Sequence, residues 1–183
     1  MLIEFNDKKI FAFADTHGKH RDLVVPVDAD ILVCAGDVCD AGDEAQLVDF
    51  FAWFEALPAR HKLFVPGNHD LPFELVPHLA RTLVPQNVEY VEEGGFMMDG
   101  IRFYVLPVRM YMYSPVEIPY RVDVLVTHGA PWGIFGEDKY SCSILREVVD
   151  EAQPRIHLFG HIHNHGGETL QVGKTLFCNV AVT

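Results

Sequence analysis

The sequence predicts a layered α/β fold, a four-layer αββα arrangement in which two β-sheets pack face to face and helices cover their outer faces. Two observations predict it. Short, nearly continuous apolar runs recur along the chain, as is typical of strands that are buried on both faces. Two longer segments between these runs have the spacing of helices. The 183 residues contain no repeat and no Gly/Ser-rich linker, so we expect one domain over residues 1–183.

Five apolar runs have strand character, and each is followed at once by a polar cluster. These runs span residues 10–14, 31–34, 63–65, 124–127 and 156–159. Layered α/β folds place their ligands beyond the carboxyl ends of the strands. We therefore expect the polar residues that follow the runs to meet at one rim of the fold.

Helices and further strands complete the predicted layers. Segments 45–57 and 141–152 are the two predicted outer-layer helices, and they end near Pro58 and Pro154. Asp99-Gly100 and Gly173 are tight-turn signals of the kind that joins paired strands. The strands predicted around these turns span residues 88–91, 96–98, 101–106, 168–172 and 174–180.

The composition bounds the class of function. A formal net charge of -12 and a pI near 5.1 oppose binding to nucleic-acid polymers or anionic membranes, because both need clustered Lys and Arg. No run approaches the roughly 18 apolar residues of a membrane span, and the first residues do not resemble a secretory leader. We expect a cytoplasmic protein whose cysteines are reduced and mostly buried, namely Cys34, Cys39, Cys142 and Cys178.

Seven potential metal ligands stand in the polar clusters. Each cluster alone has a structural explanation, because Asn, Asp and Gly are common in turns and His can alternate at the end of a strand. Together, however, the clusters bring oxygen and imidazole donors, with no thiolate, to one predicted rim. The seven residues are Asp15, His17, Asp37, Asn68, His128, His161 and His163.

The donor types indicate which ions would bind. Mixed carboxylate, amide and imidazole donors suit Mn, Fe, Zn or Ni better than Ca or Mg. Seven donors are too many for one tetrahedral ion, but they suit two ions that share a carboxylate about 3.5 to 4 Å apart, an arrangement used for phosphoryl hydrolysis. The pattern therefore predicts a dinuclear transition-metal centre, in which we expect manganese to support activity.

Five short motifs stand in order along the chain: D-x-H (Asp15, His17), G-D-x-x-D (Gly36, Asp37, Asp40), G-N-H-D (Gly67 to Asp70), T-H-G (Thr127 to Gly129) and G-H-x-H (Gly160 to His163). Over residues 15–163 the chain resembles the calcineurin-like metallophosphoesterases, which implies the metallo-dependent phosphatase fold. The D-T-H, T-H-G-A-P and F-G-H-I-H segments look most like the small metallophosphoesterase-domain proteins grouped with class III cyclic-nucleotide phosphodiesterases.

The resemblance implies two ligand sets that share Asp37 as a bridge. The first set is Asp15, His17, Asp37 and His163, and the second is Asp37, Asn68, His128 and His161.

The same resemblance implies that His69 does not bind metal. His69 would instead face the scissile phosphate as a general acid or transition-state donor, with Asp40 orienting its ring. A hydroxide that bridges the two ions would attack phosphorus directly, so no protein nucleophile is required.

Two features bear on the reaction. Protein Ser/Thr phosphatases of this superfamily carry an Arg directly after the last aspartate of G-D-x-x-D, where this chain has Ala41-Gly42. That difference weakens the interpretation as a phosphoprotein phosphatase. Some members of the most similar subgroup lack the first histidine of G-H-x-H and are poor catalysts, whereas His161 is present here. We therefore expect an intact catalytic site.

The expected substrate is a small phosphodiester, such as a cyclic nucleotide or another nucleotide-like ester, because no long insertion could form a cap domain or a groove for a polymer. Two alternatives remain. The first is a phosphomonoesterase of the same fold, and the second is a scaffold that keeps the fold for protein binding with little turnover.

Several residues are candidates for the substrate side of the site. Asn68 and His69 are expected to contact the substrate, and Arg109 is either a phosphate contact or a solvated surface cation. Segment 106–120 is rich in aromatic residues and Met, so it could stack a nucleobase or simply pack on the sandwich. The remaining candidates, each with a structural alternative, are Tyr111, Tyr113, Trp132, Phe135, His20 and His165.

Overall fold

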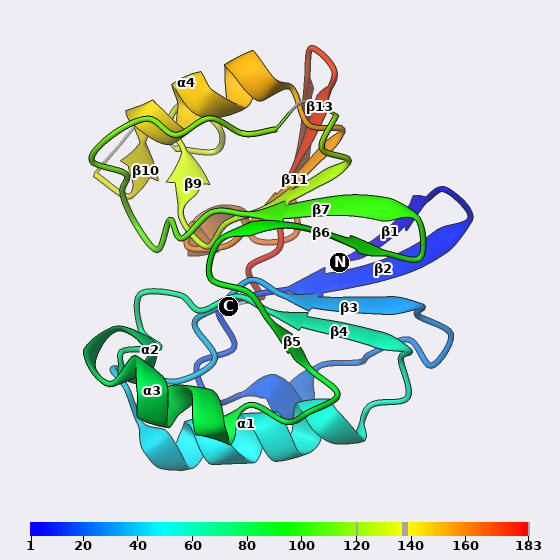
Figure 1. The fold of residues 1–183 in the computed structure, drawn as a ribbon, viewed down its shortest axis with the longest axis vertical. Helices are drawn as coiled ribbons and strands as arrows, with labels where there is room; N and C mark the ends of the chain where they lie inside the picture. The colour runs from blue at the N-terminus through cyan, green and yellow to red at the C-terminus, as the bar shows by residue number, and fades with distance from the viewer. Residues whose placement is uncertain (120, 137–138, 183) are drawn as a thin grey trace.

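The computed structural model describes residues 1–119, 121–136 and 139–182, and it confirms the predicted αββα sandwich. Figure 1 shows the four layers stacked from helix α1 (Glu44–Ala56), through two β-sheets, to helix α4 (Ser143–Ala152). The last position of the aromatic segment, Tyr120, lies outside the described residues.

The first sheet holds five strands in the order β1-β2-β3-β4-β5. Strands β2 to β5 run parallel, and β1 pairs antiparallel with β2 at the edge. The strands are β1 (Leu2–Phe5), β2 (Lys8–Phe13), β3 (Ile31–Cys34), β4 (His61–Phe64) and β5 (Glu89–Tyr90).

The second sheet holds six strands in the order β12-β13-β11-β8-β7-β6. Its four central strands run parallel, whereas the edge strands β12 and β6 are antiparallel to their neighbours. The strands are β6 (Gly94–Met98), β7 (Ile101–Val105), β8 (Val124–Val126), β11 (Ile156–Phe159), β12 (Thr169–Val172) and β13 (Thr175–Asn179).

The central strands are apolar because both of their faces are buried. In β2, Ile10 and Ala12 belong to the core between the two sheets, whereas Phe11 and Phe13 belong to the core beneath α1. In β8, Leu125 faces the core beneath α4 while its neighbours face the other sheet. This alternation explains why the predicted strands read as continuous apolar runs.

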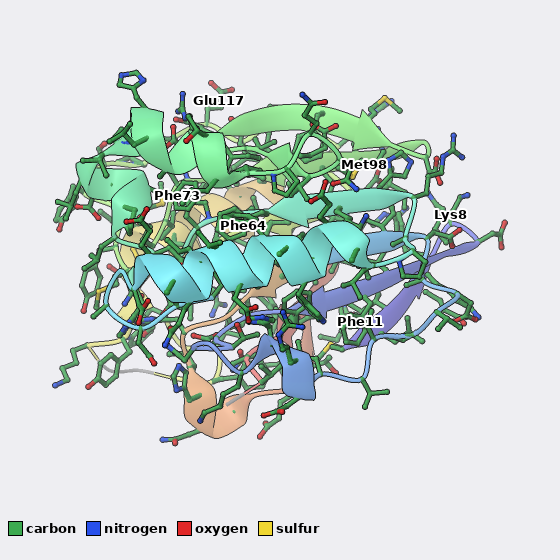
Figure 2. All side chains as sticks on the ribbon, turned by 90° about the horizontal axis from the view of Figure 1, so that it is seen from below. Lys8, Phe11, Phe64, Phe73, Met98 and Glu117 are labelled. Atoms are coloured by element: carbon green, nitrogen blue, oxygen red, sulfur yellow. The ribbon has the colours of Figure 1, made fainter. Side chains whose placement is uncertain are left out.

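Helix α1 begins at a side-chain cap and buries an aromatic face. The carboxylate of Asp43 accepts a hydrogen bond from the Gln46 N–H at 3.1 Å, which satisfies a free donor of the first turn. Phe50 and Phe54 pack on Phe13 with ring centroids 6.4 and 5.9 Å apart. Figure 2 looks onto this helix from outside and shows it lying across the first sheet.

Helix α4 begins two residues later than predicted. Residues Ser141–Cys142 form strand β10 instead, which pairs in parallel with β9 (Ala130–Pro131). The Cys142 sulfur then caps the helix by accepting from the Leu145 N–H. The prediction extended the helix to 141 because helical spacing alone does not reveal this short pairing.

Besides β9 and β10, one strand and two one-turn α-helices were not predicted. Strand β1 forms a hairpin with β2 through Asn6 and Asp7, which have φ values of 50° and 60°. Two one-turn helices, α2 (Pro72–Leu75) and α3 (Pro77–Ala80), each begin at a proline.

The four cysteines are free and buried, as predicted. Among the described residues, no helix combines the length and the apolar character needed to cross a bilayer.

Candidate metal centre

The loops that carry the candidate ligands leave the carboxyl ends of five parallel strands. Three loops follow β2, β3 and β4 of the first sheet, and two follow β8 and β11 of the second. A parallel bridge between Ala14 and Ala181 joins the two sheets beside these loops. The seven predicted ligands therefore gather from both sheets at one rim, as the sequence predicts.

One donor group consists of Asp15, His17 and His163, whose donor atoms all lie within 4.8 Å of one another. Asp15 Oδ1 lies 3.0 Å from His163 Nε2. Its other oxygen, Oδ2, accepts from the backbone N–H of His161 at 2.9 Å. That backbone contact fixes the carboxylate so that Oδ1 faces the imidazoles.

The second donor group consists of Asp37, His128 and His161, again within 4.8 Å. His128 Nε2 lies 3.2 Å from Asp37 Oδ2 and 3.1 Å from Asn68 Oδ1. His128 Nδ1 donates to the Ala35 carbonyl at 2.7 Å, which directs Nε2 toward the group. His128 Nε2 is also 4.0 Å from Asp15 Oδ1, so the two groups adjoin.

The spacing of the donors fits bound cations. An ion held about 2.1 Å from each ligand places neighbouring donor atoms about 3 Å apart. Three of the donor–donor contacts above, those within the two groups and to Asn68, are 3.0 to 3.2 Å. Both ring nitrogens of His17 and Nε2 of His161 are buried without a hydrogen-bond partner. Buried polar atoms normally have partners. Buried nitrogens of this kind fit a role as metal donors.

Four of the seven predicted ligands have left-handed backbone conformations. Such φ values are uncommon outside glycine and cost on the order of 1 to 3 kcal/mol each, and they concentrate at functional sites. The four residues are Asp15 (φ 60°), His17 (φ 43°), Asp37 (φ 54°) and His161 (φ 70°).

Two motif glycines permit the loops to approach the carboxylates. A Cβ on Gly67 would lie 2.1 Å from Asp37 Oδ1, and a Cβ on Gly160 would lie 2.4 Å from Asp15 Oδ2. Both distances are far below van der Waals contact. Only glycine leaves room for the backbone beside each carboxylate at these positions.

Asp70 ties the loops after β3 and β4 together, a role that sequence reasoning missed. The side chain is fully buried. Oδ2 accepts from the backbone N–H groups of Asp37 and Gly67 at 2.8 Å, and Oδ1 accepts from Val38 at 3.0 Å and Cys39 at 3.3 Å. The final aspartate of G-N-H-D was the available signal, because a buried carboxylate needs several donors.

The charges within the second group stabilise one another. Burial opposes the charge of both Asp37 and His128, but their contact outweighs it. The pKa of Asp37 is held below its usual range, and the pKa of His128 is raised to about 9. Burial lowers the pKa of His161 to about 4. A cation that binds here must therefore displace a proton from His128 at neutral pH.

His69 projects beside the first donor group, with its ring centroid 4.9 Å from that of His17. Its backbone N–H donates to Asp37 Oδ1 at 2.7 Å, and its Nδ1 accepts from the Ala41 N–H at 3.3 Å. Because Nδ1 accepts, the proton of the neutral ring lies on Nε2. That nitrogen can donate a hydrogen bond to an oxygen of a substrate.

Asp40 lies beside His69 and also contacts a predicted metal ligand, because donor atoms of Asp40, His17 and His69 all lie within 4.8 Å of one another. Its Oδ1 is 3.1 Å from His17 Nδ1, without hydrogen-bond geometry. The hydrogen bond to His69 Nδ1 comes instead from the N–H of Ala41, in a turn with a φ of 45°. The contact that orients the His69 ring is therefore a backbone one.

A cavity of about 300 Å³ opens over both donor groups. Its lining consists of Asp37, His69, Tyr140, His161, Ile162, His163 and Asn164. The cavity thus contains ligands from both groups together with the proposed proton donor, and Tyr140 and Asn164 were not predicted from the sequence.

Most other candidates lie outside this lining. Arg109 faces Glu74 at 3.6 Å and lines a separate cavity of about 170 Å³ with Val65 and Pro66. Its guanidinium is directed there because an acidic partner from α2 is available. Of the two alternatives for Arg109, a phosphate contact and a surface cation, the first would need it at the metal-centre cavity, whose lining does not include it. Neither Tyr111 nor Tyr113 lines the metal-centre cavity.

The remaining aromatic and histidine candidates have structural contacts. Trp132 is exposed at the surface, and Phe135 packs on Phe159 and stacks on His165. His165 also pairs with Glu168 at 3.1 Å. His20 is buried beneath α1, 3.1 Å from Asp49, and belongs to neither donor group.

The sequence is similar to a known family and to several known proteins. The family model described as calcineurin-like phosphoesterase matches residues 8–165. UPF0046 protein K07C11.7 of Caenorhabditis elegans is 30% identical over 94% of this chain and 69% of its own length. Metallophosphoesterase domain-containing protein 1 of Homo sapiens is 28% identical over 92% of this chain and 64% of its own length.

A solved structure shares the fold at low sequence identity. The phosphopantetheinyl hydrolase (PptH) from Mycobacterium tuberculosis superposes with a TM-score of 0.64 and 14% identity. The match covers 94% of this chain and 88% of that structure. At this identity the likeness concerns the fold alone.

Proposed function

Since this chain belongs to the calcineurin-like phosphoesterase family, we propose that it is a two-metal phosphoesterase that hydrolyses small phosphodiesters. The observation that carries the proposal is the pair of adjoining donor groups beneath one cavity. Bound transition-metal cations would supply Lewis acidity, neutralising phosphate charge and lowering the pKa of an attacking water.

The proposed metal ligands come from loops of both sheets. Asp15, His17 and His163 would hold one ion, and His128, His161 and Asn68 would hold the other. Asp37, whose Oδ2 faces His128 and whose Oδ1 is held by a backbone N–H, would complete the second site and bridge to the first.

The residues around the donors would orient the substrate and move a proton. His69 lines the cavity, and its Nε2–H would donate to the oxygen of the departing ester group. Asn68 would present its amide N–H to a phosphate oxygen, because its Oδ1 is directed toward His128. The hydrogen bonds that Asp70 accepts from the backbone N–H groups of Asp37 and Gly67 would keep both loops in place.

The lining of the cavity favours a diester over a monoester. Phosphomonoesters carry a second negative charge, which an Arg or Lys normally balances. Within the described part of the chain, no Arg or Lys is among the residues that line the cavity, and Arg109 is directed to Glu74. A singly charged diester therefore suits this site better.

Hydrolysis of two artificial esters tests the proposal. Manganese-loaded protein should cleave bis-p-nitrophenyl phosphate faster than p-nitrophenyl phosphate. The variant His69→Ala should lose activity on both esters while keeping its metal content, because His69 is proposed to donate a proton and is not one of the proposed metal ligands. A large preference for the monoester would favour the phosphomonoesterase alternative, and an inactive wild type with bound metal would favour the scaffold.

A further inference from the structure

Tyr140 is the one phenol ring among the described residues that line the metal-centre cavity. The other lining residues are Asp37, His69, His161, Ile162, His163 and Asn164. The tyrosine side chain is 43% exposed. An aromatic surface of this size at the opening of a ligand cavity is suited to a flat apolar group.

The position of the Tyr140 ring is fixed by contacts on several sides. Its centroid is 6.0 Å from that of His161 at an interplanar angle of 67°. Lys139 Nζ lies 5.0 Å from the centroid, in a cation–π contact. Tyr111 Oη donates to the Lys139 carbonyl and thereby ties the preceding residue to the aromatic segment. These contacts place the ring at the cavity beside His161.

Tyr140 and His69 flank different donor groups. His69 packs on His17, a member of the first group, with ring centroids 4.9 Å apart. Tyr140 packs on His161, a member of the second. If His69 protonates the departing ester oxygen, the leaving group lies beside the first group. The ester group that stays on phosphorus is then directed toward Tyr140.

We propose that Tyr140 is a specificity-determining residue that stacks against an aromatic group, a nucleobase or an aryl ring, on the retained ester of the diester substrate. The inference rests on the proposed function and narrows its substrate class. The cavity of about 300 Å³ is at the lower end of small-ligand sites, which suits one nucleoside-sized group rather than a polymer.

The test compares two diesters that share a leaving group. Methyl p-nitrophenyl phosphate and the p-nitrophenyl ester of thymidine 5′-monophosphate both release p-nitrophenol but differ in the retained group. Wild-type protein should show the higher kcat/KM for the thymidine ester. Tyr140→Ala should lower the ratio of the two kcat/KM values by roughly 3- to 10-fold, and Tyr140→Phe should restore it. Tyr113→Ala, which removes a 93% exposed tyrosine outside the lining, is the matched control.

A binding measurement separates this inference from the proposed function. Calorimetry of the manganese-loaded protein should give tighter binding of thymidine 5′-monophosphate than of methyl phosphate, with the difference lost in Tyr140→Ala. That result would support stacking on Tyr140 even if no ester were hydrolysed. In that case only the proposed function would fail. An unchanged preference in Tyr140→Ala, or an equal loss for both ligands, would overturn the inference.

Discussion

Replacement of Asp70 by alanine should destabilise the protein and loosen the loops that carry the candidate ligands. The substitution removes the acceptors of three short backbone hydrogen bonds, from Asp37, Gly67 and Val38 at 2.8 to 3.0 Å. A buried donor left without a partner costs about 1 to 3 kcal/mol. Burial and the neighbouring Asp37 raise the pKa of Asp70. The buried carboxylate charge is therefore itself unfavourable, and its removal offsets part of the free energy lost with the three hydrogen bonds. We expect a net loss of about 3 kcal/mol in the free energy of unfolding.

Urea unfolding of the metal-free Asp70→Ala variant measures this loss without a contribution from bound ions. Asp150→Ala is the matched control, because Asp150 is exposed and forms an ion pair with Arg146 one helical turn away. That surface pair should contribute less than about 1 kcal/mol. A loss for Asp70→Ala that equals the control, together with unchanged manganese content, would refute the assigned role of Asp70.

Three further predictions follow from individual contacts. Burial lowers the pKa of His157 to about 3 from 6.5, so its contribution to stability is complete above pH 6.5 and falls below it. By pH 5 the loss should be about 2 kcal/mol. The pH series of urea midpoints should show this loss in wild type but not in His157→Leu. Gly67→Ala should reduce manganese binding measured by calorimetry, because the new Cβ would occupy the position of Asp37 Oδ1, whereas Gly173→Ala in the β12–β13 turn should bind normally. Manganese affinity should rise roughly tenfold per pH unit between about pH 6 and 9, because the ion displaces the His128 proton; a flat profile would contradict that exchange.

The sequence predicts the layers well because each depends on a repeated pattern. Strands buried on both faces read as apolar runs, and the parallel direction of β2, β3, β4, β8 and β11 sends every following loop to the same rim. Ligand identity could be proposed for the same reason, since the polar clusters occupy equivalent positions after successive strands.

Features that depend on contacts between distant loops could not be predicted. Asp70 acts by accepting from backbone N–H groups of two different loops, and the contact of Asp40 with His17 joins the loops after β3 and β2. Tyr140, which lines the cavity, directly precedes the two-residue strand β10 that pairs with β9. Elements this short carry no periodic signal, which also explains why α2 and α3 were missed.

Metal stoichiometry tests the central claim most directly. Wild-type protein loaded with manganese and freed of excess ion should contain about two ions per chain by elemental analysis. The variant His163→Ala should retain about one ion, whereas His165→Ala should retain two. The two histidines lie in the same short turn with side chains 44% and 43% exposed, but only His163 belongs to a donor group. One ion or none in the wild type, or equal losses in both variants, would contradict the assignment of two adjoining metal sites.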